Sequence, residues 1–223
     1  MAALFSRILK TSFGLLLIAA GCYLILRANI GLDPWSALSY GLSAKTGLSF
    51  GAITVLTSLT LLVIALLLGE KIGAGTLLDS FLIGPFIDFF IRLDFLPVIN
   101  HLVLGVLIVL IGLIFISAGI YFYMRTSLGC GPRDSLMIAL GKRLPKLPIG
   151  LVRSCIEGAV LLSGWLLGAK VGLGTVICVL GIGIILQAVF KIFRFDAKSI
   201  VHEDIVTSLK NVLRKKETTG LRG

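Results

Sequence analysis

The sequence predicts an all-α membrane protein that crosses the bilayer six times, built from two three-helix repeats of opposite orientation. Hydrophobic residues form 57% of the chain and charged residues only 14%, whereas soluble domains are about one quarter charged. Charges divide the chain into apolar stretches, most of them close to the roughly 20 residues that cross about 30 Å of hydrocarbon. Long helical runs without ten-residue alternation exclude an outer-membrane barrel.

The internal repeat is clearest where residues 14–34 align with residues 112–132. Nine of these 21 positions are identical, and they include glycine, tyrosine, arginine and proline. After a shift of one residue the match resumes, with LLLGEKIGAGT at 66–76 against WLLGAKVGLGT at 165–175. Chance matches between apolar helices fall on leucine, so this pattern indicates a duplication.

Each repeat has the same parts in the same order. These are a spanning helix, a Gly/Pro break, a short extra helix, a second span, a glycine turn and a third span. In repeat one (about 8–93) we expect helices at 12–26, 34–46, 50–68 and 76–91. In repeat two (about 102–192) we expect them at 102–124, 132–144, 149–167 and 175–190.

The ends of the short helices have recognisable signals. Pro34 and Pro132 suit a first helical position, where a missing N–H costs nothing. Asp33 is placed to cap the helix that follows it, and Gly47 to end that helix.

Three spans per repeat is an odd number, so the two copies run through the membrane in opposite senses. Of the 21 lysines and arginines, 16 fall on one side when six helices alternate. Basic loops stay in the cytoplasm, so both termini are expected there. This distribution explains the net charge of +10 without a nucleic-acid partner.

The chain is expected to hold one membrane domain, residues 1–195, and a tail, residues 196–223. In the tail, apolar residues recur at helical spacing opposite charged ones, and the basic run Arg214-Lys215-Lys216 follows. This pattern predicts a cytoplasmic amphipathic helix on the membrane surface. Docking of a partner is the alternative.

Ionisable residues within spans are candidates for a substrate or proton path because they are costly there. Arg153 and Glu157 stand four residues apart on one helix face, and they either line a path or neutralise each other. Asp79 lies deeper in its span than Asp88. The two aspartates point about 180° apart on an ideal helix, so both face one pore only if the helix bends at Gly84-Pro85. The deeper Asp79 is the better candidate.

The first helix of each repeat ends at a matched arginine, Arg27 or Arg125. Each anchors its helix at the interface or lies beside a site formed by the break that follows. Such a site requires breaks that re-enter the membrane, with helix N-termini facing an anionic group. The basic residues at 133–146 favour surface loops instead. The break and turn positions concerned are Gly31, Pro34, Gly129, Gly131, Pro132, Gly73, Gly75, Gly172 and Gly174.

Other chemistry has little support in the sequence. Cys22, Cys130, Cys155 and Cys178 are scattered, and the two histidines lie far apart, so we expect no disulfide, metal site or cofactor. The glycine turns lack the Lys-Ser/Thr ending of a phosphate loop, and close helix packing explains them better. No Ser-His-Asp or paired-carboxylate arrangement is evident, so we do not expect an enzyme.

Several motifs together resemble the bacterial YczE/YyaS/YitT family of integral membrane proteins. The resemblance covers about residues 14–190 and implies a bacterial cytoplasmic-membrane protein; the family pattern often has glycine where this chain has Asp33 and Cys130. It identifies no substrate. The motifs are GLDPW (31–35), TGLSFG (46–51), GAGT (73–76), GCGPRD (129–134), GLVR (150–153) with Ile156-Glu157, GWLLG (164–168) and VGLGT (171–175).

We therefore expect a small secondary transporter for an unknown small-molecule solute, since such transporters commonly use inverted repeats. Six helices enclose little space, so a homodimer is a possible form. The alternative function is a membrane accessory or regulatory protein that binds a cytoplasmic partner through its tail and its basic loop.

Overall fold

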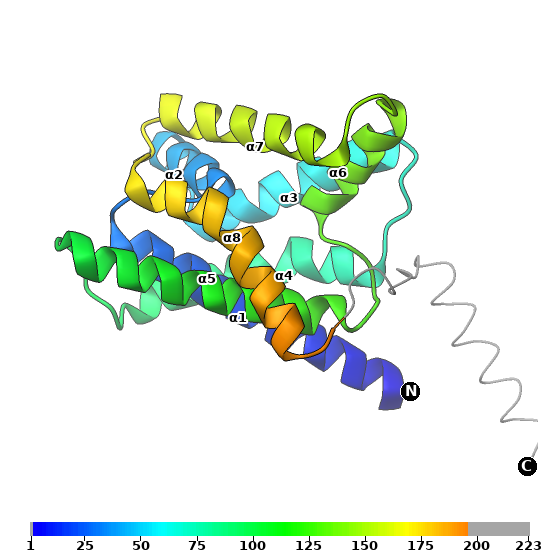
Figure 1. Cartoon of the computed structure of the whole chain (residues 1–223), viewed down its shortest axis with the longest axis horizontal. Coiled ribbons are helices and arrows are strands. Elements are labelled where there is room, and N and C mark those ends of the chain that lie inside the picture. Colours follow the sequence, from blue (N-terminus) through cyan, green and yellow to red (C-terminus); the bar gives the residue numbers. More distant parts are fainter. Residues whose placement is uncertain (1, 196–223) are drawn as a thin grey trace, which may run out of the picture.

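The computed structural model of the protein describes residues 2–195, which form eight helices and no strand (Figure 1). The long helices cross the molecule in one general direction, and α8 runs obliquely over α5. The helices are α1 (Ala2–Ala28), α2 (Pro34–Thr46), α3 (Phe50–Leu67), α4 (Ala74–Leu93), α5 (Leu102–Met124), α6 (Pro132–Arg143), α7 (Ile149–Leu166) and α8 (Leu173–Ile192).

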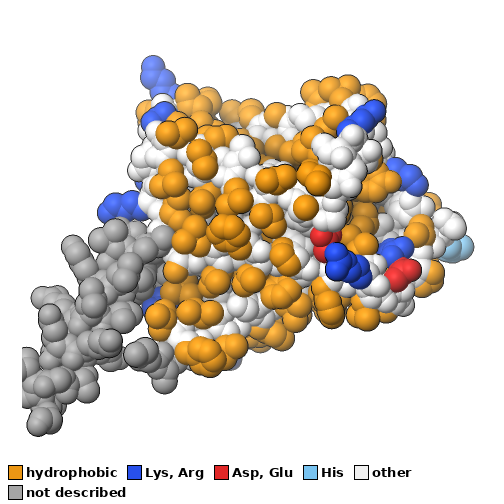
Figure 2. Space-filling model, turned by 180° about the vertical axis from the view of Figure 1, so that it is seen from behind, with side chains coloured by type: hydrophobic (Ala, Val, Ile, Leu, Met, Phe, Trp, Pro, Cys, Tyr) orange, Lys and Arg blue, Asp and Glu red, His pale blue; other side chains and the backbone are white. Residues whose placement is uncertain are grey.

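The all-α prediction with six spans is confirmed. In the described part of the chain, six helices are long and apolar enough to cross a membrane, and α2 and α6 are the two short extra helices. Many large apolar side chains point outward, such as Leu67 and Ile184, which are 80% and 71% exposed. Figure 2 shows a face covered largely by such side chains, with most lysines and arginines toward its edges. This surface fits a lipid bilayer.

The predicted boundaries agree with the structure except at the first helix, which begins ten residues earlier than expected, at Ala2. No glycine or proline interrupts residues 2–12, so the helix continues outward through Arg7 and Lys10. The predicted amphipathic helix in the tail lies outside the described residues.

Helices α1 and α5 cross in contact along most of their length, and glycines form the crossing. A Cβ atom on Gly14 would lie 2.7 Å from the carbonyl oxygen of Gly119, and one on Gly112 would lie 2.9 Å from that of Gly21. Because Gly14 faces Gly119 while Gly21 faces Gly112, the two helices run antiparallel. Small residues allow this approach of backbones, which apolar surface alone does not drive in lipid.

The short helices α2 and α6 begin inside the bundle. Trp35, in the first turn of α2, packs against Leu61 of α3 and Leu136 of α6, with Val160 of α7 beside them. Leu61 and Val160 lie well inside their helices, so the breaks before α2 and α6 extend inward from the bundle ends. The interpretation as surface loops is therefore wrong.

The basic residues that favoured surface loops lie mostly at the outer end of α6. Lys142 donates to Glu70 at 2.6 Å, and Arg143 and Lys146 are exposed. Only Arg133 lies at the inner end of the helix, where its guanidinium stacks on an aromatic ring. A half-helix can therefore enter the bundle while most of its charges stay at the surface.

We predict that Gly21→Ala destabilises the protein by about 1–3 kcal/mol, because the new methyl group would overlap the backbone of α5. The ideal Cβ atom at position 21 lies 2.5 Å from the carbonyl oxygen of Gly112. The measurement is denaturant unfolding in detergent, followed by helical circular dichroism.

The matched control is Gly158→Ala on α7, where no described atom lies within 4 Å of the added carbon. This control should be neutral or more stable by up to ~1 kcal/mol, from helix propensity alone. Equal stability of the two variants would contradict a close crossing of α1 and α5.

Candidate functional site

Each Gly/Pro break is held by the glycine turn of the other half of the chain. In the first break, Ile30 accepts a hydrogen bond on its carbonyl oxygen from the N–H of Gly174, at 2.8 Å. In the second, Leu128 accepts one from the N–H of Gly75, at 2.7 Å. The glycine turns therefore serve close packing, as expected, and each turn packs against a break.

The glycines that open the breaks are required by both conformation and space. Gly31 and Gly129 have φ values of 126° and 134°, a region that side chains rarely adopt. A Cβ atom would lie 2.7 Å from the Thr175 hydroxyl in the first case and 2.9 Å from the Thr76 hydroxyl in the second. The Thr76 hydroxyl also donates to the carbonyl oxygen of Cys130.

The inner ends of α2 and α6 meet through Trp35 and Arg133. The guanidinium carbon of Arg133 lies 4.9 Å from the centre of the Trp35 ring, a cation–π distance. Trp35 follows the proline of the first break and Arg133 follows that of the second, so the two occupy matched positions in the repeats. The half-helices therefore point their N-terminal ends toward a shared region.

An acidic side chain stands at each of these N-terminal ends. Asp33 caps α2 by accepting the N–H of Ser36 at 3.2 Å. Gly131 caps α6 without a side chain, and a Cβ atom there would lie 2.7 Å from a carboxylate oxygen of Asp79. Asp79 thus brings from α4 the negative charge that Asp33 supplies to α2, and both offset the positive ends of the helix dipoles.

These groups belong to one site. Cys22 of α1 lies within electrostatic reach of Asp33, Asp79 and Arg133, and Tyr123 of α5 lies within reach of Asp79. We call the set the central cluster: Cys22, Asp33, Trp35, Asp79, Tyr123 and Arg133.

The central cluster has unused hydrogen-bonding capacity. One buried carboxylate oxygen of Asp33 finds no hydrogen-bond partner among the described residues, whereas the Tyr123 hydroxyl lies beside that of Thr76. Most buried polar groups in proteins are paired, so the free oxygen of Asp33 is a candidate for contact with a bound molecule. In the same part of the chain, no three His, Cys, Asp or Glu side chains gather closely enough to hold a metal ion.

Cys130 lies at the edge of the cluster, in the second break. Its sulfur is 3.3 Å from the Ser135 hydroxyl, so the thiol takes part in the hydrogen bonding at the start of α6.

Among the described residues, Arg153 and Glu157 bond to each other and to no member of the central cluster. They pair along α7 at 2.8 Å, with side chains 52% and 25% exposed. The predicted ion pair is therefore present, with Arg153 half-exposed and Glu157 mostly buried. Asp88 also points elsewhere: it accepts hydrogen bonds from the Ser49 hydroxyl at 2.5 Å and from the N–H of Gly51 at 2.7 Å.

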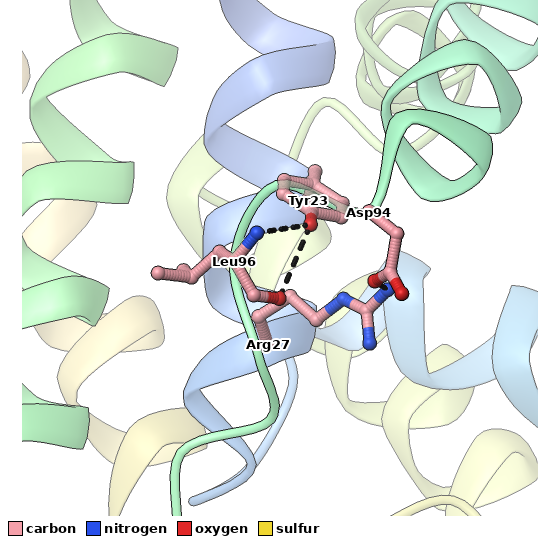
Figure 3. A network of polar contacts seen from close by, with 4 residues as sticks. All are labelled: Tyr23, Arg27, Asp94 and Leu96. Carbon is pink, nitrogen blue, oxygen red and sulfur yellow. Dashed lines mark hydrogen bonds and ion pairs between the residues drawn. The ribbon is translucent and has the colours of Figure 1, made fainter.

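Arg27 and Arg125 stand at helix ends and not in the central cluster. Figure 3 shows Arg27 reaching Asp94 at the end of α4, beside Tyr23, whose hydroxyl contacts the backbone of Leu96. Arg125 donates to the Tyr121 hydroxyl at 2.9 Å. These contacts fit the interpretation of both arginines as anchors.

Of the five charged residues proposed from the sequence, only Asp79 belongs to the central cluster. Asp33 was predicted only as a helix cap, and the remaining members were not predicted as site residues. A signal was available, because Trp35 and Arg133 directly follow the two break prolines. Tyr123 had no such signal, since only the packing of α5 against its neighbours directs its hydroxyl there.

Comparisons with known proteins agree with the membrane fold and assign no activity. The pattern of a "Family of unknown function (DUF6198)" matches residues 5–191. An uncharacterized protein of Haemophilus influenzae is 34% identical over 78% of this chain and 79% of its own length. The uncharacterized membrane protein YczE of Bacillus subtilis is 32% identical, over 78% and 80%.

YyaS, another uncharacterized protein of Bacillus subtilis, is 29% identical over 80% of this chain and 90% of its own length. The resemblance to the YczE/YyaS/YitT family is therefore confirmed. No solved structure matches the chain.

We predict that Asp33→Ala lowers stability by about 1 kcal/mol, because α2 loses the side chain that caps it. Asp33→Asn keeps an oxygen for the Ser36 N–H and should restore most of the loss. Detergent unfolding curves measure both variants. Equal destabilisation by alanine and asparagine would mean that the charge, and not the cap, stabilises this end of α2.

Proposed function

This chain belongs to the DUF6198 family of integral membrane proteins, and from its central cluster we propose that it is a carrier for a small solute. The solute would bind where the inner ends of α2 and α6 meet. The observation that carries the proposal is the pair of half-helix N-termini directed at one region, where one carboxylate oxygen of Asp33 has no hydrogen-bond partner. Secondary transporters build their sites from such discontinuous helices.

The inverted repeat is part of the proposal. The α1–α5 crossing supports it, since Gly14 matches Gly112 in sequence and Gly21 matches Gly119, while the contacts pair Gly14 with Gly119 and Gly21 with Gly112. A two-fold axis in the membrane plane produces this exchange. The crossed contacts between breaks and glycine turns follow the same rule.

The cluster indicates what part of a solute could be recognised. Trp35 offers an aromatic face, Arg133 a fixed positive charge, and Asp33 a free carboxylate oxygen. The two carboxylates are offset by one guanidinium and two helix N-termini, so the site has little net charge. A polar solute of small size and low net charge fits this balance.

The location in the cell follows the charge distribution. With 16 of 21 basic residues assigned to one side, the proposal has both termini in the cytoplasm of a bacterium, with the chain in its inner membrane. We propose transport and not catalysis, since half-helix N-termini that meet at a polar site are typical of carriers.

Transport is testable while the solute is still unidentified. Purified protein in liposomes would be incubated with an isotope-labelled mixture of small bacterial metabolites, and uptake would be followed by mass spectrometry. We expect at least one solute to enter faster than in protein-free liposomes. Asp79→Asn should slow that entry about ten-fold or more, because a buried charge loses its role at the α6 N-terminus.

The matched control is Asp94→Asn, at the exposed end of the same helix, which should leave uptake within about two-fold because exposed ion pairs contribute little. Uptake equal to that of empty liposomes for every solute would overturn the proposal. So would uptake that Asp79→Asn and Asp94→Asn reduce alike.

A further inference from the structure

The two halves of the structure differ in one helix contact. Helices α1 and α4 pack together as α5 and α8 do, and each short helix contacts the span that follows it. Helices α3 and α4 also pack closely, whereas their counterparts α7 and α8 barely touch. In Figure 1, α8 diverges from α7 after the turn that joins them.

The α3–α4 contact is made by glycine backbones and reinforced by Asp88. A Cβ atom on either Gly51 or Gly84 would overlap the backbone of the other residue. Asp88 binds the start of α3 through Ser49 and Gly51, at 2.5 Å and 2.7 Å. These contacts hold the start of α3 against α4, beside an open pocket that Ser49, Asp88 and Arg92 also line.

The matched glycines on α7 and α8 have no such contact. Gly150 corresponds to Gly51, and Gly183 to Gly84, after the one-residue shift of the repeat. A Cβ atom on either would meet no described atom within 4 Å. Glycine within a helix lowers stability by about 1 kcal/mol relative to alanine. No contact in this conformation requires glycine at either position.

The same face of α7 exposes charge. Arg153 and Glu157 occupy the positions of Thr54 and Ser58, which are buried, at 3% and 4% exposure. Arginine and glutamate on an uncovered face of a spanning helix are costly in a bilayer, even when paired. Closure by α8 over this face would cover Arg153, now half-exposed, and the remaining exposed part of Glu157.

We infer that the exposed face of α7 around Gly150 is a docking surface for α8 of the same chain. In a second conformation α8 would pack there through Gly183, as α4 packs on α3 now, and α4 would leave α3. Both states would use the same type of contact, a close glycine approach, so exchange between them need not cost much energy.

The exchange would open the two ends of the central cluster in turn. Helix α2 runs beside α7 in the same sense, with Ala37 near Gly164 and Gly41 near Leu167. It runs opposite to α3, with Ser39 bonded to Thr54 near the start of that helix. The starts of α3 and α7 therefore lie at opposite ends, and closing one while opening the other is alternating access.

Spin labels on matched exposed positions can measure the exchange by pulsed electron paramagnetic resonance. One pair, Leu56→Cys with Phe89→Cys, reports on α3 and α4. The matched pair, native Cys155 with Ala188→Cys, reports on α7 and α8. The other cysteines would be replaced by alanine or serine, and the protein studied in liposomes.

We expect two distances for each pair, with the fraction of short α7–α8 distances equal to the fraction of long α3–α4 distances. Gly51→Ala should raise the short α7–α8 fraction about ten-fold, because it blocks the present closure. Gly183→Leu should abolish that fraction and keep the present state, while Gly158→Leu, elsewhere on α7, should change neither. Ser49→Ala is the milder alternative if Gly51→Ala does not fold.

A single long α7–α8 distance in the wild type, Ser49→Ala and Gly183→Leu alike would overturn the inference. The inference rests on the proposed carrier only for its purpose, and the two can fail separately. Exchange of distances without solute uptake would refute the carrier, and uptake with fixed distances would refute the exchange.

Discussion

The need to satisfy backbone hydrogen bonds within a membrane governs this structure. Extended segments such as those before Pro34 and Pro132 expose N–H and C=O groups that lipid cannot pair. Here each break is paired with the glycine turn of the other half, through Gly174 and Gly75. The glycines of these turns have no side chain, which lets the backbones approach. The Gly-x-Gly-Thr motifs and the breaks therefore form one structural unit.

The pairing of breaks with glycine turns sets the position of the central cluster. Once the breaks extend inward, α2 and α6 must begin inside the bundle, and their positive ends come together. The carboxylates of Asp33 and Asp79 offset them, and the Arg133 guanidinium finds an aromatic face instead of water. Polarity inside the bundle is therefore concentrated where the two halves meet, which is where a carrier needs a binding site.

Sequence reasoning recovered much of the fold and less of the site. Hydropathy and charge identified six spans, and Pro34 and Asp33 marked the start of α2 correctly. The position of the short helices within the bundle was misjudged, because all the lysines and arginines between positions 133 and 146 were treated as one group. Arg133 lies at the inner end of α6 and Lys142 at the outer, a separation that depends on helix direction.

By itself, the sequence determined the number of apolar helices and predicted a repeat, because these depend on composition and local order. Only the tertiary structure decided which charges share a site. Asp79 lies at the start of α6 near Arg133, whereas Arg153 and Glu157 pair with each other on α7, because packing between distant helices sets the direction of each side chain. The difference between α3–α4 and α7–α8 also belongs to the tertiary structure, since matched sequences here adopt unlike contacts.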